Sequence, residues 1–432
     1  MSALETQASQ RIDRSLALPA GAGSILLYQA VFLGLTIAAS IPVARFLGPS
    51  EKGVINLFTL LTNLIAEFGL LGVNSGLLYF LANRRTPLPA VHAAALRAAF
   101  ILGAAWFVAM ILTLPILAEV FPGLPRHFLL SAGIIAPLLL YRPLWSTIMT
   151  GIDRAVQTYR IGAAFSALAF LGVLVLWGMG SMNAGSVIWL TVLLIVAFCA
   201  YAFAVLGDTH RFRFGAAQEC LRGATKYGLV AYLGLVCNYL HLRIDQVLVN
   251  LYLGPRGVGI YTVSVAAAEL LWLIDSAITN ASLFRISSAE ARMSWRLTFR
   301  LFSLTFGILV GVAILVASLA DPAVRLLYGA EFHEAVWPLR LLLPGIIAWG
   351  SARLFSQFVS FNAGRPQLCT GAAFVSMFIN VIGNIYMIPR WGLPGAAVMS
   401  SVSYLMNAGL VAAAFVWLGH RQTTQGPVED LR

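Results

Sequence analysis

The stretch RFLGPSEKGVINLF (Arg45–Phe58) has a second version, NLYLGPRGVGIYTV (Asn250–Val263), and each lies between long apolar stretches. The two versions align without gaps at a constant offset of 206 residues, which pairs Gly48, Pro49 and Gly53 with Gly254, Pro255 and Gly259. A glycine can take the left-handed conformation that ends a helix, and the following proline suits the first turn of the next helix. The sequence therefore predicts the same helix-to-helix turn twice, almost half the chain apart.

The composition indicates an integral membrane protein. Of the 432 residues, 59% are hydrophobic and only 10% are charged, whereas soluble domains carry about 25% charged residues. The net charge is +11, but the basic residues form short groups between apolar runs and no polar domain collects them. Membrane lipids are therefore expected partners, and nucleic acid is not.

Twelve stretches are long and apolar enough to cross a bilayer as helices, which takes about 20 residues each. They are residues 24–46, 54–82, 95–118, 128–150, 157–178, 184–206, 226–251, 258–283, 297–319, 335–361, 368–388 and 394–418. The first run is too long for a cleaved signal peptide, so it is expected to be retained. The loops between the stretches are short and rich in glycine and proline.

The distribution of basic residues predicts the orientation. With the amino terminus in the cytoplasm, eighteen Lys and Arg residues fall on the cytoplasmic side, six on the opposite side and four within spans. This positive-inside bias favours twelve spans with both termini cytoplasmic. For a bacterial cell, the expected location is the cytoplasmic (inner) membrane.

The repeated turns predict the domain organisation. One turn joins spans one and two and the other joins spans seven and eight, so six spans separate them and both halves face the same way. The predicted fold is an all-α polytopic membrane protein with two parallel six-helix lobes around a central cavity. Its predicted parts are a cytoplasmic tail (1–23), an N-terminal lobe (24–207), a basic cytoplasmic linker (208–225), a C-terminal lobe (226–418) and a second cytoplasmic tail (419–432).

Five segments together resemble the polysaccharide or O-antigen flippase family, which is related to the lipid II flippases and to the multidrug-and-toxin extrusion transporters. They are ARFLGPSEKGVINLF, RIDQVLVNLYLGPRGVGIYTV, LLYGAEFHEAVWPLRLLLPG, SFNAGRPQL and MIPRWGLPGAAVMSSVSYLMNAG, in family order across residues 24–418. The resemblance implies a flippase that moves an undecaprenyl-pyrophosphate-linked oligosaccharide from the cytoplasmic to the outer leaflet by alternating access. It also implies a role in polysaccharide biosynthesis, with glycosyltransferases or a polymerase as possible partners.

Four arginines lie inside the predicted spans, where an uncompensated charge is expensive. Arg142 and Arg353 occupy nearly equivalent positions in the two lobes, Arg243 lies in span seven and Arg340 in span ten. Guanidinium groups stay protonated and bind phosphate oxygens through paired hydrogen bonds. These four are the predicted ligands of the pyrophosphate or glycan. The alternative for each is a salt bridge within its lobe or a side chain that reaches the membrane surface.

Four further side chains are candidates for a coupling ion or proton. Asp245 and His241 share one face of span seven, where a structural Asp–His hydrogen bond is the alternative. Glu67 in span two and Glu269 in span eight are the others, and a polar clamp between helices is their alternative. Arg243 and Asp245 are two residues apart, so they point in nearly opposite directions and are not expected to pair.

Other chemistries lack a sequence signal. No P-loop motif is present, and the four cysteines show no metal-ligand spacing, so no cofactor, no metal and no enzymatic activity are expected. Two alternatives to the flippase remain open. A cation-coupled multidrug antiporter should favour acidic over basic cavity residues, whereas a membrane glycan polymerase or ligase should carry a large outer loop.

Overall fold

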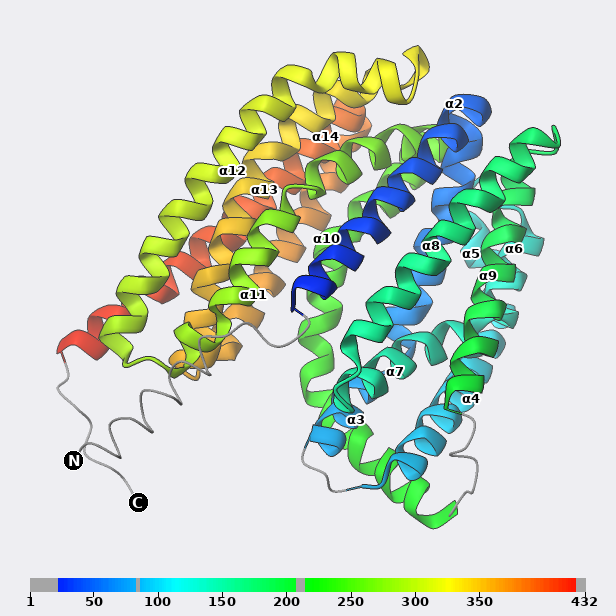
Figure 1. Cartoon of the computed structure of the whole chain (residues 1–432). Helices are drawn as coiled ribbons and strands as arrows, with labels where there is room; N and C mark the ends of the chain where they lie inside the picture. The colour runs from blue at the N-terminus through cyan, green and yellow to red at the C-terminus, as the bar shows by residue number, and fades with distance from the viewer. Residues whose placement is uncertain (1–21, 83–85, 207–213, 425–432) are drawn as a thin grey trace.

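The computed structural model describes residues 22–82, 86–206 and 214–424, and every regular element in these ranges is a helix (Figure 1). In chain order they are α2 (Ala22–Gly69), α3 (Val73–Ala82), α4 (Leu88–Leu112), α5 (Leu114–Val120), α6 (Arg126–Ile134), α7 (Ala136–Gly151), α8 (Ala155–Gly178), α9 (Ala184–Val205), α10 (Phe214–Glu269), α11 (Trp272–Ser288), α12 (Ala291–Leu327), the 3-10 helix η2 (Ala330–Ala335), α13 (Val336–Gln357), the π-helix η3 (Phe358–Asn362) and α14 (Pro366–Thr424). The prediction of an all-α membrane protein is confirmed.

Three of the long helices are interrupted by a glycine. Gly48 interrupts α2 with φ 72° and ψ 179°, Gly254 interrupts α10 with φ 70° and ψ −172°, and Gly392 interrupts α14 with φ 61°. The predicted positive φ is confirmed at both repeated turns. However, ψ near 180° lies far from the left-handed helical region, where ψ is about 47°, so the chain makes an extended kink instead of a left-handed helix cap.

Eight of the described helical segments are long and apolar enough to span a membrane, and the pair α6–α7, bent by 47°, raises this number to nine. Three of these segments contain the interrupting glycines Gly48, Gly254 and Gly392. Dividing each of them at its glycine turns nine into twelve, the number of spans inferred from the sequence. The count of twelve stays a prediction.

Two groups of helices stand side by side in Figure 1. The first half of the chain supplies α4, α7, α8 and α9, whereas the second half supplies α11 to α14. The helices α2 and α10 lie against each other and join the groups. This grouping agrees with the predicted halves, although their equivalence as parallel lobes stays a prediction.

The two repeated turns contact each other in a reciprocal way. A Cβ atom on Gly53 would overlap the carbonyl oxygen of Pro255, and one on Gly259 would overlap that of Pro49. Nearby, the Asn56 amide donates a hydrogen bond to the hydroxyl of Thr262, its partner at the offset of 206. Equivalent residues touch each other in this way when a two-fold axis runs between two repeats. The contact therefore supports an approximate two-fold relation between the halves.

Several predicted boundaries differ from the structure. Predicted span three (95–118) crosses the break between α4 and α5, and span four (128–150) crosses the one between α6 and α7. The predicted C-terminal tail (419–432) is helical as far as Thr424, and its remaining residues lie outside the described residues.

Predicted span two (54–82) is split at Leu71 and Gly72, which both have positive φ, into the end of α2 and the whole of α3. The predicted linker (208–225) is helical from Phe214 onward, because α10 begins there. The N-terminal tail, apart from Ala22 and Gly23, and residues 208–213 of the linker lie outside the described residues.

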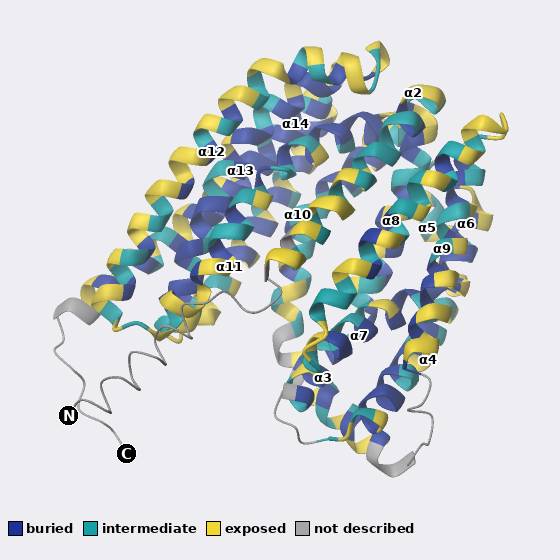
Figure 2. Cartoon of the chain, viewed as in Figure 1, coloured by how far each residue is buried: buried dark blue, intermediate teal, exposed yellow. Residues whose placement is uncertain are grey.

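The outward faces of the bundle are apolar. Figure 2 shows exposed residues along the outer edge of α12 and buried residues on the side toward α13. Large hydrophobic side chains such as Phe100, Val175, Ile314 and Ile382 are exposed on α4, α8, α12 and α14. An exposed apolar surface on every side is expected where lipid, not water, surrounds the protein. The protein is therefore a multi-pass membrane protein.

Candidate functional site

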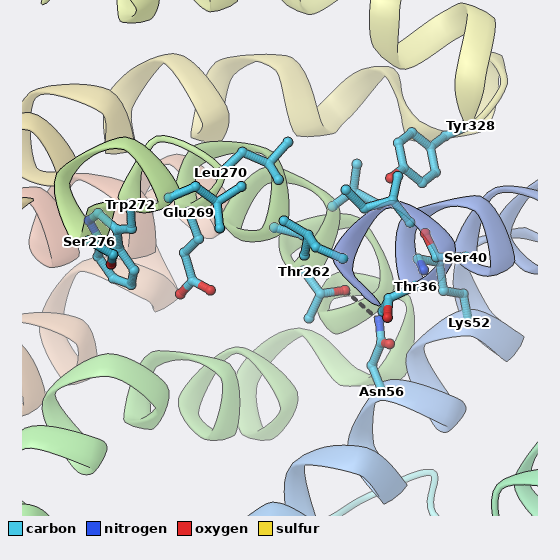
Figure 3. Close-up of a pocket in the computed structure, with 15 residues that line it drawn as sticks. Thr36, Ser40, Lys52, Asn56, Thr262, Glu269, Leu270, Trp272, Ser276 and Tyr328 are labelled. Atoms are coloured by element: carbon cyan, nitrogen blue, oxygen red, sulfur yellow. Dashed lines mark hydrogen bonds between the residues drawn. The ribbon is translucent and has the colours of Figure 1, made fainter. Parts of the chain in front are cut away.

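A cavity of about 410 Å³ lies between α2, α10 and α11. Its polar lining comes from Thr36, Ser40, Lys52, Asn56, Thr262, Glu269 and Ser276. Figure 3 shows Lys52, Ser40 and Tyr328 at one end, Glu269, Trp272 and Ser276 at the other, and the Asn56–Thr262 hydrogen bond between them. We call this space the central cavity.

Two further spaces lie beside the central cavity. A second cavity of about 390 Å³, between α10, α13 and α14, shares Trp272 with it and is lined by Arg353, Asn238, Asn407 and Trp349. A third space of about 360 Å³ runs along the end of α10 and along α12 and shares Ile37, Val263, Ala266, Leu270 and Tyr328 with the central cavity. All its other lining residues are apolar, so we call it the apolar groove.

Arg243 is paired with Glu269, which lines one end of the central cavity. Arg243 Nη1 lies 2.6 Å from Glu269 Oε1, and Nη2 lies 3.0 Å from Oε2. The two side chains are 27% and 19% exposed. Two parallel hydrogen bonds make this a strong and oriented pair. A predicted anion ligand and a predicted coupling residue therefore neutralise each other in this structure.

Arg353 is also paired with a carboxylate. Its Nη1 donates to Asp275 Oδ2 and to Ser276 Oγ, both at 2.9 Å, and its side chain is 40% exposed whereas that of Asp275 is fully buried. Asp275 fixes the guanidinium, whose other face reaches the second cavity. Arg353 therefore remains available to a ligand, because only one of its nitrogens is occupied by these two bonds.

The other two arginines lie away from these cavities. Arg142 of α7 stacks its guanidinium on the ring of Phe198 in α9, 5.5 Å from the centroid. Arg340 of α13 donates to the carbonyl oxygen of Ala317 in α12 and lies 5.7 Å from the ring of Trp337. Arg353 thus lines the second cavity, and Arg243 is linked to the central cavity through its partner Glu269. Neither Arg142 nor Arg340, nor the residues that they contact, line either cavity.

Asp245 and His241 are buried against α14. The Asp245 carboxylate accepts hydrogen bonds from Tyr261 at 2.7 Å, from Ser400 at 2.9 Å and from the backbone of Gln246. His241 Nε2 lies 3.0 Å from the hydroxyl of Ser403, and its Nδ1 has no partner among the described residues. No hydrogen bond joins the two side chains, so the direct Asp–His bond considered from the sequence is not formed. As expected, Arg243 and Asp245 form no ion pair with each other.

The sequence missed Lys52, because the predicted second span began at residue 54 and Lys52 was assigned to the loop. Its exposed fraction is only 6%, and it lines the central cavity. Its counterpart in the second turn is Val258, so the asymmetry of the two copies was the available signal. Glu67, by contrast, is exposed on α2 and forms no ion pair with the described residues.

The described part of the chain contains no group of three or more His, Cys, Asp or Glu residues that could hold a metal ion. The four cysteines are free thiols. What the site offers is a cavity with cations and paired ions, which joins an apolar groove.

The fold is similar to those of two solved membrane proteins, one of which is a transporter of the MOP superfamily. The inward closed structure of the lipid II flippase MurJ matches with a TM-score of 0.75 at 12% identity, over 93% of this chain and 90% of that one. An inward-facing multidrug resistance MATE family transporter of this superfamily matches with a TM-score of 0.70 at 15% identity, over 93% and 98% of the chains.

Sequence comparison defines the family more closely. A model of the polysaccharide biosynthesis protein family matches residues 43–337, more than half of the chain, and the chain belongs to this family. The probable low-salt glycan biosynthesis flippase Agl15 of Haloferax volcanii is 22% identical over 391 residues, which are 88% of this chain and 79% of that protein. An uncharacterized membrane protein of Methanocaldococcus jannaschii is 22% identical over 200 residues. That match covers 44% of this chain and 38% of the relative's length.

Proposed function

We propose that this protein is a flippase for a lipid-linked oligosaccharide, whose lipid and saccharide are joined through phosphate or pyrophosphate. The direction is from the cytoplasmic to the outer leaflet, and the product serves polysaccharide biosynthesis. The observation that carries the proposal is the union of the central cavity with the apolar groove, because these two spaces fit the two parts of an amphipathic substrate.

The groove suits the lipid tail. Its walls include Val312 and Val316 of α12 and Ile274 of α11, whereas Leu315 and Leu319 beside them are 57% and 50% exposed. The groove is therefore accessible from the membrane. A prenyl chain in it would gain roughly 0.8 kcal/mol per buried methylene relative to water but little relative to lipid, so it can enter and leave readily.

The cavities suit the headgroup. Arg353 and the Arg243–Glu269 pair offer donors to oxygen atoms, and Trp272 and Trp349 offer flat apolar faces beside the amides of Asn238 and Asn407. An aromatic ring with polar neighbours binds a sugar by covering its C–H face while its hydroxyls form hydrogen bonds. The lobes then change their relative orientation around the occupied site, as alternating access requires.

Coupling to a proton or a cation is assigned to Asp245. This carboxylate is 2% exposed and joins α10 to α14 through Tyr261 and Ser400. A change in its charge would change hydrogen bonds between helices, which is how a local event biases a two-state element. His241 lies one helical turn away and contacts the hydroxyl of Ser403. That hydroxyl donates a hydrogen bond to the carbonyl oxygen of Ser400, the residue whose side chain binds Asp245.

The second candidate function is a cation-coupled multidrug antiporter of the same superfamily. The observation in its favour is that an acidic residue, Glu269, lines the central cavity. However, Arg243 already neutralises Glu269, so the cavity lacks the excess negative charge that would attract a cationic drug. A polymerase or ligase is disfavoured, because the segment between α12 and α13 is only η2 with its short flanks.

A deletion strain and a dye-binding assay together distinguish the two functions. Deletion of the gene should cause a lipid-linked saccharide to accumulate on the cytoplasmic leaflet, and the wild-type gene should restore export. The double variant Arg243→Gln with Arg353→Gln should fail to restore it, whereas Arg142→Gln serves as the matched control. Tight binding of cationic dyes by the purified protein, with no accumulation in the deletion strain, would instead support the antiporter.

A further inference from the structure

Lys52 places a buried positive charge at one end of the central cavity. It lies three residues after Pro49, in the first turn of α2 beyond Gly48, and is 6% exposed. Figure 3 shows it at the end of the cavity beside Ser40 and Tyr328, away from Glu269 and Trp272. The side chain lines the cavity, so its ammonium is directed at the space that a ligand would fill.

No carboxylate neutralises Lys52. It forms no ion pair and no hydrogen bond with any described residue, and its Nζ lies over the ring of Tyr328, 5.9 Å from the centroid. Of the nearby acids, Glu51 accepts a hydrogen bond from the backbone of Ala184, and Glu331 lies against Gly48. A buried charge without a partner is costly, so Lys52 is poised to gain from an anionic ligand.

The arginines of the site differ in this respect. Arg243 is paired with Glu269, and Arg353 with Asp275, so the two pairs add no net charge. In the central cavity, therefore, the unneutralised cation of the described residues is Lys52. Electrostatic attraction of a phosphate depends on net charge at the cavity, whereas paired arginines contribute mainly directional hydrogen bonds.

The position of Lys52 also fits an amphipathic ligand. Tyr328, which lies under Lys52, lines both the central cavity and the apolar groove. A phosphate beside Lys52 would let a prenyl chain continue into the groove past Tyr328. A saccharide on the other side of that phosphate would extend along the cavity toward Asn56, Trp272 and Arg353.

We infer that Lys52 holds the phosphate group next to the lipid in the substrate, and that it is the principal attractor of the anion. The hydroxyl of Ser40, which makes no hydrogen bond with the described residues, is placed to donate to the same phosphate. This inference rests on the proposed function and adds the group that recognises the phosphate. In the second turn the position equivalent to Lys52 is occupied by Val258, which is fully buried. Only the first copy of the turn therefore has a positive charge at this position.

The test uses the full chain in nanodiscs of uncharged lipid, with undecaprenyl pyrophosphate as the probe and undecaprenol as the phosphate-free control. Lys52→Met should weaken binding of the pyrophosphate about tenfold to a hundredfold, the range for a hydrogen bond to a charged group. Lys52→Arg should retain most of it. Lys226→Met, which replaces an exposed lysine on α10, should bind as the wild type does. Binding of undecaprenol should be the same in all variants.

Thermal unfolding provides the second readout. Without ligand, Lys52→Met should unfold at a higher temperature than the wild type, because it removes a buried unpaired charge. With undecaprenyl pyrophosphate, the wild type should gain stability and Lys52→Met should not. If Lys52→Met does not fold, Lys52→Gln, which keeps a donor but loses the charge, decides by the same two measurements.

Two results would overturn the inference in different ways. If Lys52→Met binds the pyrophosphate as the wild type does while Arg353→Gln loses binding, the phosphate lies at Arg353, and the proposed function stands without this assignment. If the wild type binds undecaprenyl pyrophosphate no better than undecaprenol, the inference and the proposed function both fail.

Discussion

The two copies of the Leu-Gly-Pro turn have nearly the same backbone conformation but carry different side chains. Both are kinked at a glycine with φ near 70°, and each packs on the other through Gly53 and Gly259. In the first copy the residue before this second glycine is Lys52, in the cavity, whereas in the second copy it is Val258, in the core. The repeat therefore preserves the turn that joins the halves, and the side chains between its glycines have diverged.

The spans diverge in the same manner. The second half holds two ion pairs beside its cavities, Arg243 with Glu269 and Arg353 with Asp275, and also Arg340 and Asp245, which form no ion pair with the described residues. The first half holds Arg142 against an aromatic ring and Lys52 without a partner. Scaffold contacts are thus symmetric, whereas charges are not.

The largest expected effect comes from the shared contact. Gly53→Ala and Gly259→Ala should each destabilise the protein by about 3 kcal/mol or more, because the new methyl group would meet a rigid carbonyl oxygen of the other turn. Thermal unfolding in detergent measures this. Gly34→Ala in α2 is the matched control, since nothing lies within 4 Å of its Cβ position. A large loss of stability at Gly53 with none at Gly259 would contradict the reciprocal contact between the two turns.

The buried ion pair comes next. Arg353→Gln should cost about 2 kcal/mol of stability, because it leaves the fully buried carboxylate of Asp275 without its cation. Asp275→Asn should cost less, since Arg353 is 40% exposed and water can solvate it. The double variant should be more stable than Arg353→Gln alone in chemical denaturation. Equal losses for both single variants and an additive double variant would contradict the pairing.

A smaller effect is expected at Arg142. Its replacement by Gln removes a contact with the ring of Phe198, which is worth about 1 kcal/mol at most sites, and should leave export nearly normal. Complementation of the deletion strain by Arg142→Gln, at matched protein level, is the measurement. Loss of export by this folded variant would place Arg142 among the substrate ligands and restore the symmetry predicted from the sequence.

The smallest effect concerns the surface pair of Arg256 and Glu334, which links the second turn to η2. Both side chains are more than half exposed, so Glu334→Gln should change stability by no more than about 0.5 kcal/mol, less at high salt. Unfolding at two salt concentrations tests this. A loss of several degrees in the unfolding temperature that does not depend on salt would contradict a weak surface ion pair and would show that Glu334 stabilises the contact between η2 and the second turn in another way.

Local features of this chain were predictable and long-range ones were not. Glycine and proline act on their own backbone, so the kinks at Gly48 and Gly254 follow from the sequence. The pairing of Arg243 with Glu269 depends on how the two parts of α10, before and after Gly254, are rotated about their axes. A sequence offset of 26 residues does not determine this rotation. Lys52 was assigned to a loop because it lies in the turn between predicted spans one and two. Its burial depends on how the surrounding helices pack, which the local sequence does not determine.

One measurement tests the central claim directly: the transfer between leaflets of a fluorescent oligosaccharide linked to undecaprenyl pyrophosphate, in vesicles that contain the purified protein. A membrane-impermeant quencher reports which leaflet holds the label. In vesicles with the wild-type protein the quenched fraction should rise above that in protein-free vesicles, and Lys52→Met should reduce the rate while Lys226→Met does not. Equal quenching with and without the wild-type protein, under the conditions and gradients tested, would contradict the account.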